Sequence, residues 1–114
     1  MKFKEDIDAL ILGCLISGPA HGYEISKRIR QLSNEVLTVA EGKLYPALHL
    51  LEAAEDITAS WIPQGNRPPR KVYEITEQGK MSLESKRRQW RSFVEGVGTV
   101  IGGTADQSRC WSRR

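Results

Sequence analysis

Long apolar runs and cysteine-rich motifs are absent from this 114-residue sequence. No segment approaches the ~18–20 apolar residues of a membrane span. Acidic residues interrupt the N-terminal stretch MKFKEDIDALILGCLISG, which lacks a convincing signal-peptide cleavage site. The two cysteines, Cys14 and Cys110, are too far apart for a disulfide framework or a zinc motif, so we expect two free thiols. These absences predict a cytoplasmic protein with no membrane partner.

Motifs for catalysis and cofactor binding are also missing. Ser17, His21 and Asp8 belong to no nucleophile motif, and no glycine-rich phosphate loop occurs. We therefore expect no enzyme activity, no cofactor and no metal site. The length suits one domain, and 39% apolar with 27% charged residues is the composition of an ordinary globular chain.

Positive charge is concentrated in the second half of the chain. Residues 1–57 carry six Lys and Arg against nine acidic residues, whereas residues 58–114 carry eleven against five. A local basic excess is one mark of a nucleic-acid-binding surface, although solvated charged faces are commoner. The charge permits a nucleic-acid partner without specifying one.

Apolar residues recur at helical spacing in four segments. We predict helices over residues 7–15, over about 23–32, from 40–42 onward, and from 77 onward after an N-cap at Thr76. Several glycines leave the end of the last helix uncertain beyond Glu95. This helix carries an apolar seam close to the a/d spacing of a coiled coil, formed by Leu83, Trp90, Val94, Val97 and Ile101.

Between the third and fourth helices the apolar period changes to two. The runs ITASWIP and RKVYEI, joined by the turn cluster QGNRPP, predict a β-hairpin. The predicted fold is therefore mainly α with a small β-hairpin wing, a winged helix-turn-helix followed by a long C-terminal helix. In that arrangement the third helix enters the DNA major groove.

Three segments, GPAHGYEISKRI, EGKLYPALHLLE and RPPRKVYEITEQG, resemble in order and spacing the signatures of PadR-family transcriptional regulators. The resemblance covers about residues 7–95 and is similar to the compact subfamily, whose members dimerise through one C-terminal helix. It implies a winged helix-turn-helix DNA-binding domain at 1–76, a C-terminal dimerisation helix at 77–101 and a flexible tail at 102–114. Two departures from the family pattern are Ala40, which removes a side-chain N-cap, and Lys43, which adds a charge.

The resemblance assigns candidate DNA contacts to the third helix and the wing. In the helix, Tyr45 either touches DNA or packs its ring on the second helix, and His49 is equally well explained as a solvated or core-edge residue. His21 and Tyr23 are more simply explained as organisers of the turn between the first two helices. The candidate DNA-binding residues are Gly42, Lys43, Tyr45, His49, Arg67, Arg70 and Lys71.

Trp90 dominates the second candidate site, which also contains Leu83, Val94 and Val97. The simplest interpretation buries its ring across a dimer interface, and a small planar aromatic effector is the alternative. We hypothesise a homodimer that binds double-stranded DNA and acts as a repressor. The other hypotheses are a winged-helix protein-interaction module with little DNA affinity and a ligand-responsive repressor. Relatives act in phenolic-acid stress, drug export and cyanobacterial circadian clock control, and no residue selects among these processes.

Overall fold

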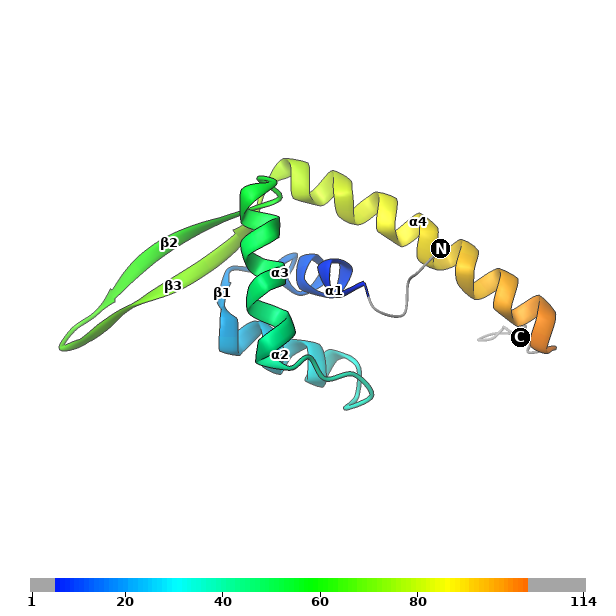
Figure 1. Cartoon of the computed structure of the whole chain (residues 1–114), viewed down its shortest axis with the longest axis horizontal. Helices are drawn as coiled ribbons and strands as arrows, with labels where there is room; N and C mark the ends of the chain where they lie inside the picture. The colour runs from blue at the N-terminus through cyan, green and yellow to red at the C-terminus, as the bar shows by residue number, and fades with distance from the viewer. Residues whose placement is uncertain (1–5, 103–114) are drawn as a thin grey trace.

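The computed structural model describes residues 6–102, so Cys110 and the predicted tail beyond residue 102 lie outside the described part. Three helices form the body of the molecule, and a β-hairpin and a long fourth helix extend from it (Figure 1). This architecture confirms the predicted mainly helical winged fold. The elements are α1 (Ile7–Leu15), β1 (Ala20–His21), α2 (Gly22–Leu32), α3 (Glu41–Ala53), β2 (Ile57–Gln64), β3 (Arg67–Ile75) and α4 (Glu77–Ile101).

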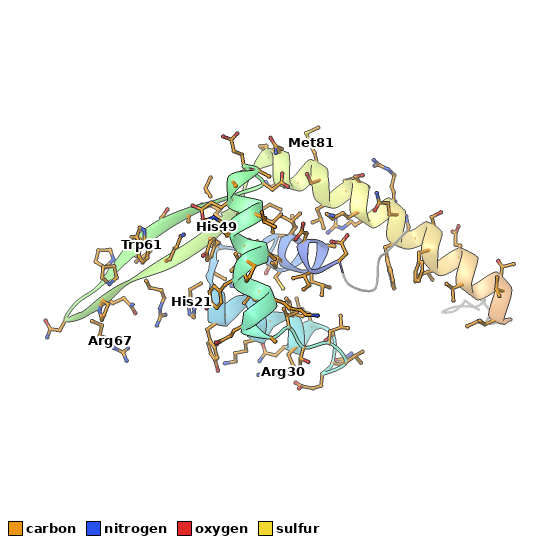
Figure 2. The ribbon with its side chains drawn as sticks, viewed as in Figure 1. His21, Arg30, His49, Trp61, Arg67 and Met81 are labelled. Carbon is orange, nitrogen blue, oxygen red and sulfur yellow. The ribbon has the colours of Figure 1, made fainter. Side chains whose placement is uncertain are left out.

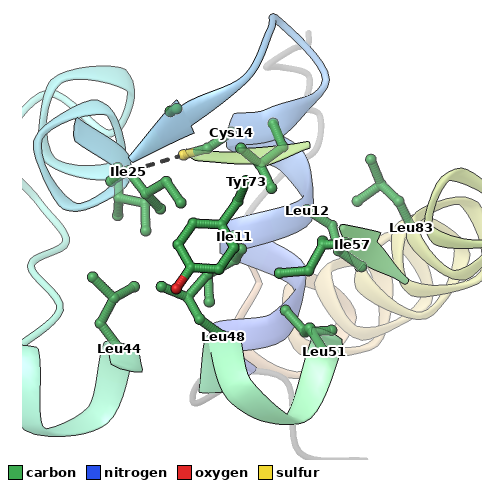
Figure 3. Close-up of a cluster of buried hydrophobic side chains, with 13 residues drawn as sticks. Ile11, Leu12, Cys14, Ile25, Leu44, Leu48, Leu51, Ile57, Tyr73 and Leu83 are labelled. Atoms are coloured by element: carbon green, nitrogen blue, oxygen red, sulfur yellow. Dashed lines mark hydrogen bonds between the residues drawn. The ribbon is translucent and has the colours of Figure 1, made fainter. Parts of the chain in front are cut away.

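The core lies where α1, α2 and α3 meet the inner end of the hairpin. In Figure 3 the leucines of α3 point toward α1 and the Tyr73 ring. Leu44 and Leu48 are fully buried, as are Ile11 and Leu12 of α1. Burying each such side chain contributes roughly 1.5–3 kcal/mol, so the spacing of apolar residues along these helices fixes how they pack.

The turn between α1 and α2 is held by side chains that satisfy exposed backbone groups. His21 Nδ1 accepts a hydrogen bond from the Glu24 amide at 3.4 Å and caps α2. The Arg28 guanidinium donates to the carbonyl oxygens of Cys14 and Gly18, at 3.2 and 2.9 Å. The predicted role of His21 as an organiser of this turn is confirmed, and Tyr23 stacks against its ring.

The predicted hairpin is confirmed, but its turn is shorter than the QGNRPP cluster suggests. Gln64 faces Arg67 across the hairpin, so only Gly65 and Asn66 turn the chain, and both prolines lie in β3. Gly65 has a φ of +66°, in the region that favours glycine. A short strand that the sequence did not predict, β1, pairs with β3 and completes an antiparallel sheet in the order β1-β3-β2.

Burial in the hairpin is confined to its inner end. Ile57 and Tyr73 are buried in the core, whereas Trp61, four residues further along β2, is 65% exposed. The period-two alternation continues outward, but no described helix covers it, because the hairpin extends away from α3 (Figure 1). The outer part is therefore free to meet a partner.

The N-terminus of α4 is fastened to the turn between α3 and β2. Thr76 caps α4 by accepting a hydrogen bond from the Gly79 amide at 2.9 Å, and its hydroxyl donates to the Glu55 carbonyl at 2.8 Å. Further along, Leu83 is buried and Lys86 forms an ion pair with Asp6, the N-cap of α1, at 3.1 Å. After these contacts α4 projects from the body on the side opposite the wing (Figure 1).

Candidate nucleic-acid interface

Helix α3 buries one face and exposes another. Leu44, Leu48 and Leu51 point into the core, and the candidate contacts Gly42, Lys43, Tyr45 and His49 are all exposed. Ala40 supplies no side-chain cap, as its residue type predicts, although its carbonyl oxygen accepts a hydrogen bond from the Lys43 amide at 2.9 Å. The four predicted residues of α3 are thus all accessible to a partner.

Tyr45 is both packed and accessible. A Cβ atom added at Gly22 would lie 2.5 Å from the Tyr45 hydroxyl oxygen, so the tyrosine ring rests directly on the first turn of α2. The side chain is nevertheless 44% exposed. The packing interpretation is therefore confirmed, and Gly22 explains why the ring can lie so close. Whether the exposed part of the ring also contacts DNA stays a prediction.

The wing carries two arginines at its outer end. Arg67 flanks the turn and Arg70 pairs with Ile62 in the strand register, and Figure 2 shows Arg67 at the far end of the hairpin. Over residues 6–102, neither arginine forms an ion pair or side-chain hydrogen bond, and the same holds for Lys43. Such cations are available to phosphate.

Lys71 differs from the other predicted wing cations. Its Nζ lies 3.2 Å from Oε1 of Glu52 on α3, and it sits 5.8 and 5.5 Å from the ring centroids of Trp61 and Tyr73. The hydrogen bond that Lys71 donates to Glu52 is the main reason that the pKa of Lys71 is raised. Lys71 therefore connects the wing to α3 within the chain.

Two residues of this region were missed by sequence reasoning. Trp61 is exposed on the wing, where the Lys71 ammonium lies over its ring. Glu52 forms an ion pair with the same lysine. A signal for Glu52 existed, because it lies seven residues after Tyr45 and three after His49, which is the spacing of one helix face. The pairing of Trp61 with Lys71 could not be read from sequence, because it depends on the strand register.

The second candidate site is a groove between α1 and α4. Its volume is about 530 Å³, and its walls include Trp90, Phe93 and Leu83 of α4 together with Leu10 of α1. Trp90 is 44% exposed, and Val94 and Val97 are each 39% exposed on the continuing seam. Leu83 is only 4% exposed, so it belongs mainly to the core of its own chain. Phe93, which stacks with Trp90, was missed by sequence reasoning.

Neither a metal-binding cluster nor a membrane-spanning helix occurs in the described part. Between residues 6 and 102, no three His, Cys, Asp or Glu side chains gather so as to hold a metal ion. Over the same range no helix combines the length and apolar content required to cross a bilayer.

The chain is similar to proteins of known family. Residues 11–85 match the Transcriptional regulator PadR-like family. A transcriptional regulator from Clostridium thermocellum has a TM-score of 0.76 and 31% identity, covering 84% of this chain and 90% of that one. The Bacillus subtilis PadR structure in complex with operator DNA has a TM-score of 0.65 and 27% identity, over 71% of this chain and 46% of that one. Escherichia coli transcriptional regulator YqjI is 31% identical over 100 residues, which are 88% of this chain and 46% of YqjI.

This chain thus spans less than half of the PadR and YqjI chains, although it spans most of the Clostridium thermocellum regulator. The family match covers more than half of this chain and includes α3, the wing and the start of α4. On this evidence the chain is a member of the PadR-like family of transcriptional regulators.

Proposed function

We propose that the chain forms a homodimer that binds an operator sequence in double-stranded DNA and represses transcription. The observation that carries this proposal is that three exposed cations of α3 and the wing, Lys43, Arg67 and Arg70, form no ion pair in the described chain. The similarity to Bacillus subtilis PadR, which was crystallised with operator DNA, supports DNA as the partner.

In this proposal the residues of α3 have different roles. Gly42 allows the first turn to approach the groove closely, Lys43 contacts phosphate, and Tyr45 and His49 face the base edges or backbone. Arg67 and Arg70 contact phosphate or the minor groove beside the site occupied by α3. Phosphate contacts position the protein, whereas contacts to base edges select the sequence.

The proposed dimer uses the projecting helix α4. Its seam residues Trp90, Val94 and Val97 are partly exposed and continue the apolar groove formed with α1. A second copy packed there would bury this surface and relate two α3 helices by a two-fold axis. Half-sites would then be separated by about 34 Å, one turn of DNA. Residues 1–76 are assigned to DNA binding and residues 77–101 to dimerisation.

Selection of bound fragments from random genomic DNA, followed by titration across a salt series, tests this proposal. We expect a roughly palindromic site and a steep fall of affinity with salt. Lys43→Ala should weaken binding to all sequences alike and reduce the salt slope by about 0.9, the contribution of one phosphate. Failure to enrich any fragment at low salt, with folded dimeric protein, would favour a protein-interaction module instead.

A second candidate function is effector sensing, because the groove lined by Trp90 and Phe93 is large enough for a small molecule. A planar aromatic compound stacked there would alter the packing of α4 against its partner. Quenching of tryptophan fluorescence by a panel of such compounds tests this idea. The quenching should disappear in Trp90→Phe, because the fluorophore that stacks on the compound is then absent. The fluorescence of Trp61 and Trp111, which remain, serves as the internal control.

A further inference from the structure

Glu52 stands at the end of the α3 surface that the proposed function gives to DNA. Tyr45, His49 and Glu52 follow one another at i, i+4 and i+7, so they lie on one strip of the helix. Tyr45 and His49 carry hydrogen-bonding groups without negative charge, which can lie against DNA. Glu52, in contrast, is a carboxylate that would repel phosphate. A carboxylate in this place requires an explanation.

The partner of Glu52 is a wing cation. Lys71 Nζ lies 3.2 Å from Glu52 Oε1, and the two side chains are 33% and 36% exposed, so the pair is reachable from solvent. In the strand register Lys71 faces Trp61, and Tyr73 faces Ala59, which places these side chains on one face of the hairpin. The Lys71 ammonium is also within 6 Å of both aromatic rings.

The pair therefore occupies the junction between α3 and the wing. Arg67 and Arg70, further out on the same hairpin, have no comparable partner in the described chain. An exposed ion pair of this kind is weak enough for a phosphate group to compete with it. Lys71 can donate a hydrogen bond to a phosphate only after its ion pair with Glu52 has broken.

We propose that Glu52 restrains DNA affinity by holding Lys71 in an internal ion pair, which makes Lys71 a latent phosphate contact. This inference rests on the proposed DNA-binding function and adds a residue that limits it. DNA must displace the carboxylate in order to recruit the third wing cation. The free regulator therefore presents fewer available charges to DNA than its sequence suggests.

A double-mutant cycle tests the inference with wild type, Glu52→Gln, Lys71→Met and the double variant. Glutamine keeps the shape of Glu52, and methionine keeps the aliphatic stem that packs near Trp61. The probe is a fluorescently labelled random-sequence duplex of about 30 base pairs, long enough for two half-sites. Affinity is measured at several salt concentrations, and thermal melts confirm that all four proteins are folded.

We expect Glu52→Gln to bind about two- to five-fold tighter and to steepen the salt slope by about 0.9, the value for one added phosphate contact. Lys71→Met should have little effect in wild type and should cancel the gain in the Glu52→Gln background. Glu74→Gln is the matched control, because Glu74 is an exposed carboxylate one residue before the end of β3, on the other face of the hairpin.

Each other outcome overturns the inference in a recognisable way. Unchanged or weaker binding by Glu52→Gln would show that the carboxylate does not restrain Lys71. An equal gain in the presence and absence of Lys71, or in Glu74→Gln, would reduce the effect to general charge. If wild type bound no duplex even at low salt, the proposed function itself would fall, and this inference with it.

Discussion

At the scale of single residues, Gly42 is a position where DNA binding would require glycine although the fold does not. It lies in the first turn of α3, and a Cβ added there would meet no described atom within 4 Å. The fold therefore tolerates a side chain at this position. A requirement for glycine would have to come from outside the chain, and close approach to DNA is the requirement that the proposed function supplies.

We expect Gly42→Ala to raise the free energy of unfolding by up to about 1 kcal/mol, because alanine has the higher helix propensity. The same change should weaken DNA binding, because the added methyl group would stand between α3 and the groove. Urea denaturation and duplex titration measure the two effects. A variant that is more stable and binds with unchanged affinity would remove Gly42 from the interface.

Cys14 provides a prediction about pH. Its thiol is buried in the core, donates to the Ile25 carbonyl at 3.9 Å (Figure 3), and has its pKa raised by this burial to about 11. At pH 8 only on the order of 0.1% is thiolate, the reactive form. In a Cys110→Ser chain, we expect a thiol reagent at pH 8 to modify Cys14 only as fast as the protein opens, and at once in denaturant.

The same pKa makes stability fall at alkaline pH. The unfolded thiol, with its ordinary pKa of 9.0, loses its proton at lower pH than the folded one, so the unfolded chain is favoured as pH rises through about 9 to 11. Urea midpoints of Cys110→Ser should therefore decrease over this range more than those of a Cys14→Ala, Cys110→Ser chain. Equal decreases would show that other groups cause the loss.

At the scale of elements, the attachment of α4 depends on Gly79. A Cβ at this position would collide with the Asp56 backbone oxygen and lie 2.8 Å from an Ile75 side-chain carbon. Asp56 is itself held, because its carboxylate accepts hydrogen bonds from Gln78 and Ser82 at 2.9 and 3.2 Å. Backbone cannot move aside as cheaply as the end of a side chain.

We expect Gly79→Ala to lower the free energy of unfolding by about 1–3 kcal/mol, the usual cost of overpacking. Gly96→Ala, in the same helix but with open space around it, should instead raise stability by up to about 1 kcal/mol. Thermal and urea unfolding of the two variants measure the contrast. Equal effects would mean that α4 is not tightly fastened at Gly79.

The elements were more predictable than their surroundings. Apolar spacing predicted the helices around Leu12, Ile25 and Leu48, because a helix and its buried face arise from the same local pattern. The exposure of Trp61 was not predictable, because alternation along a strand does not say where the neighbouring helices stop. The Glu52–Lys71 pair was missed for a similar reason, since its members are 19 positions apart and meet only in the folded chain.

At the scale of the whole molecule, the single chain is extended. Its radius of gyration is 16.3 Å and its extents are 56 × 27 × 23 Å, whereas a compact chain of this length has a radius of gyration of about 13 Å. The excess comes from the wing on one side and α4 on the other (Figure 1). Both projections carry exposed apolar residues, including Trp61 and Val94. Partners would explain why these elements project: DNA for the wing and a second copy for α4.

The last prediction separates these two partners. We expect Val94→Asp to convert the protein from a dimer to a 12.8 kDa monomer, because a charge on the seam would be buried against its copy at a cost that pairing does not offset. Met81→Asp is the matched control, since Met81 is 74% exposed on α4 two residues before the buried Leu83 and faces away from the core. Sedimentation measures mass, and duplex titration measures affinity.

A monomer that retains its fold but binds DNA much more weakly would show that pairing of two α3 helices supplies the affinity. A Val94→Asp protein that stays dimeric would place the dimer interface elsewhere, and the groove between α1 and α4 would then be left to a small-molecule effector.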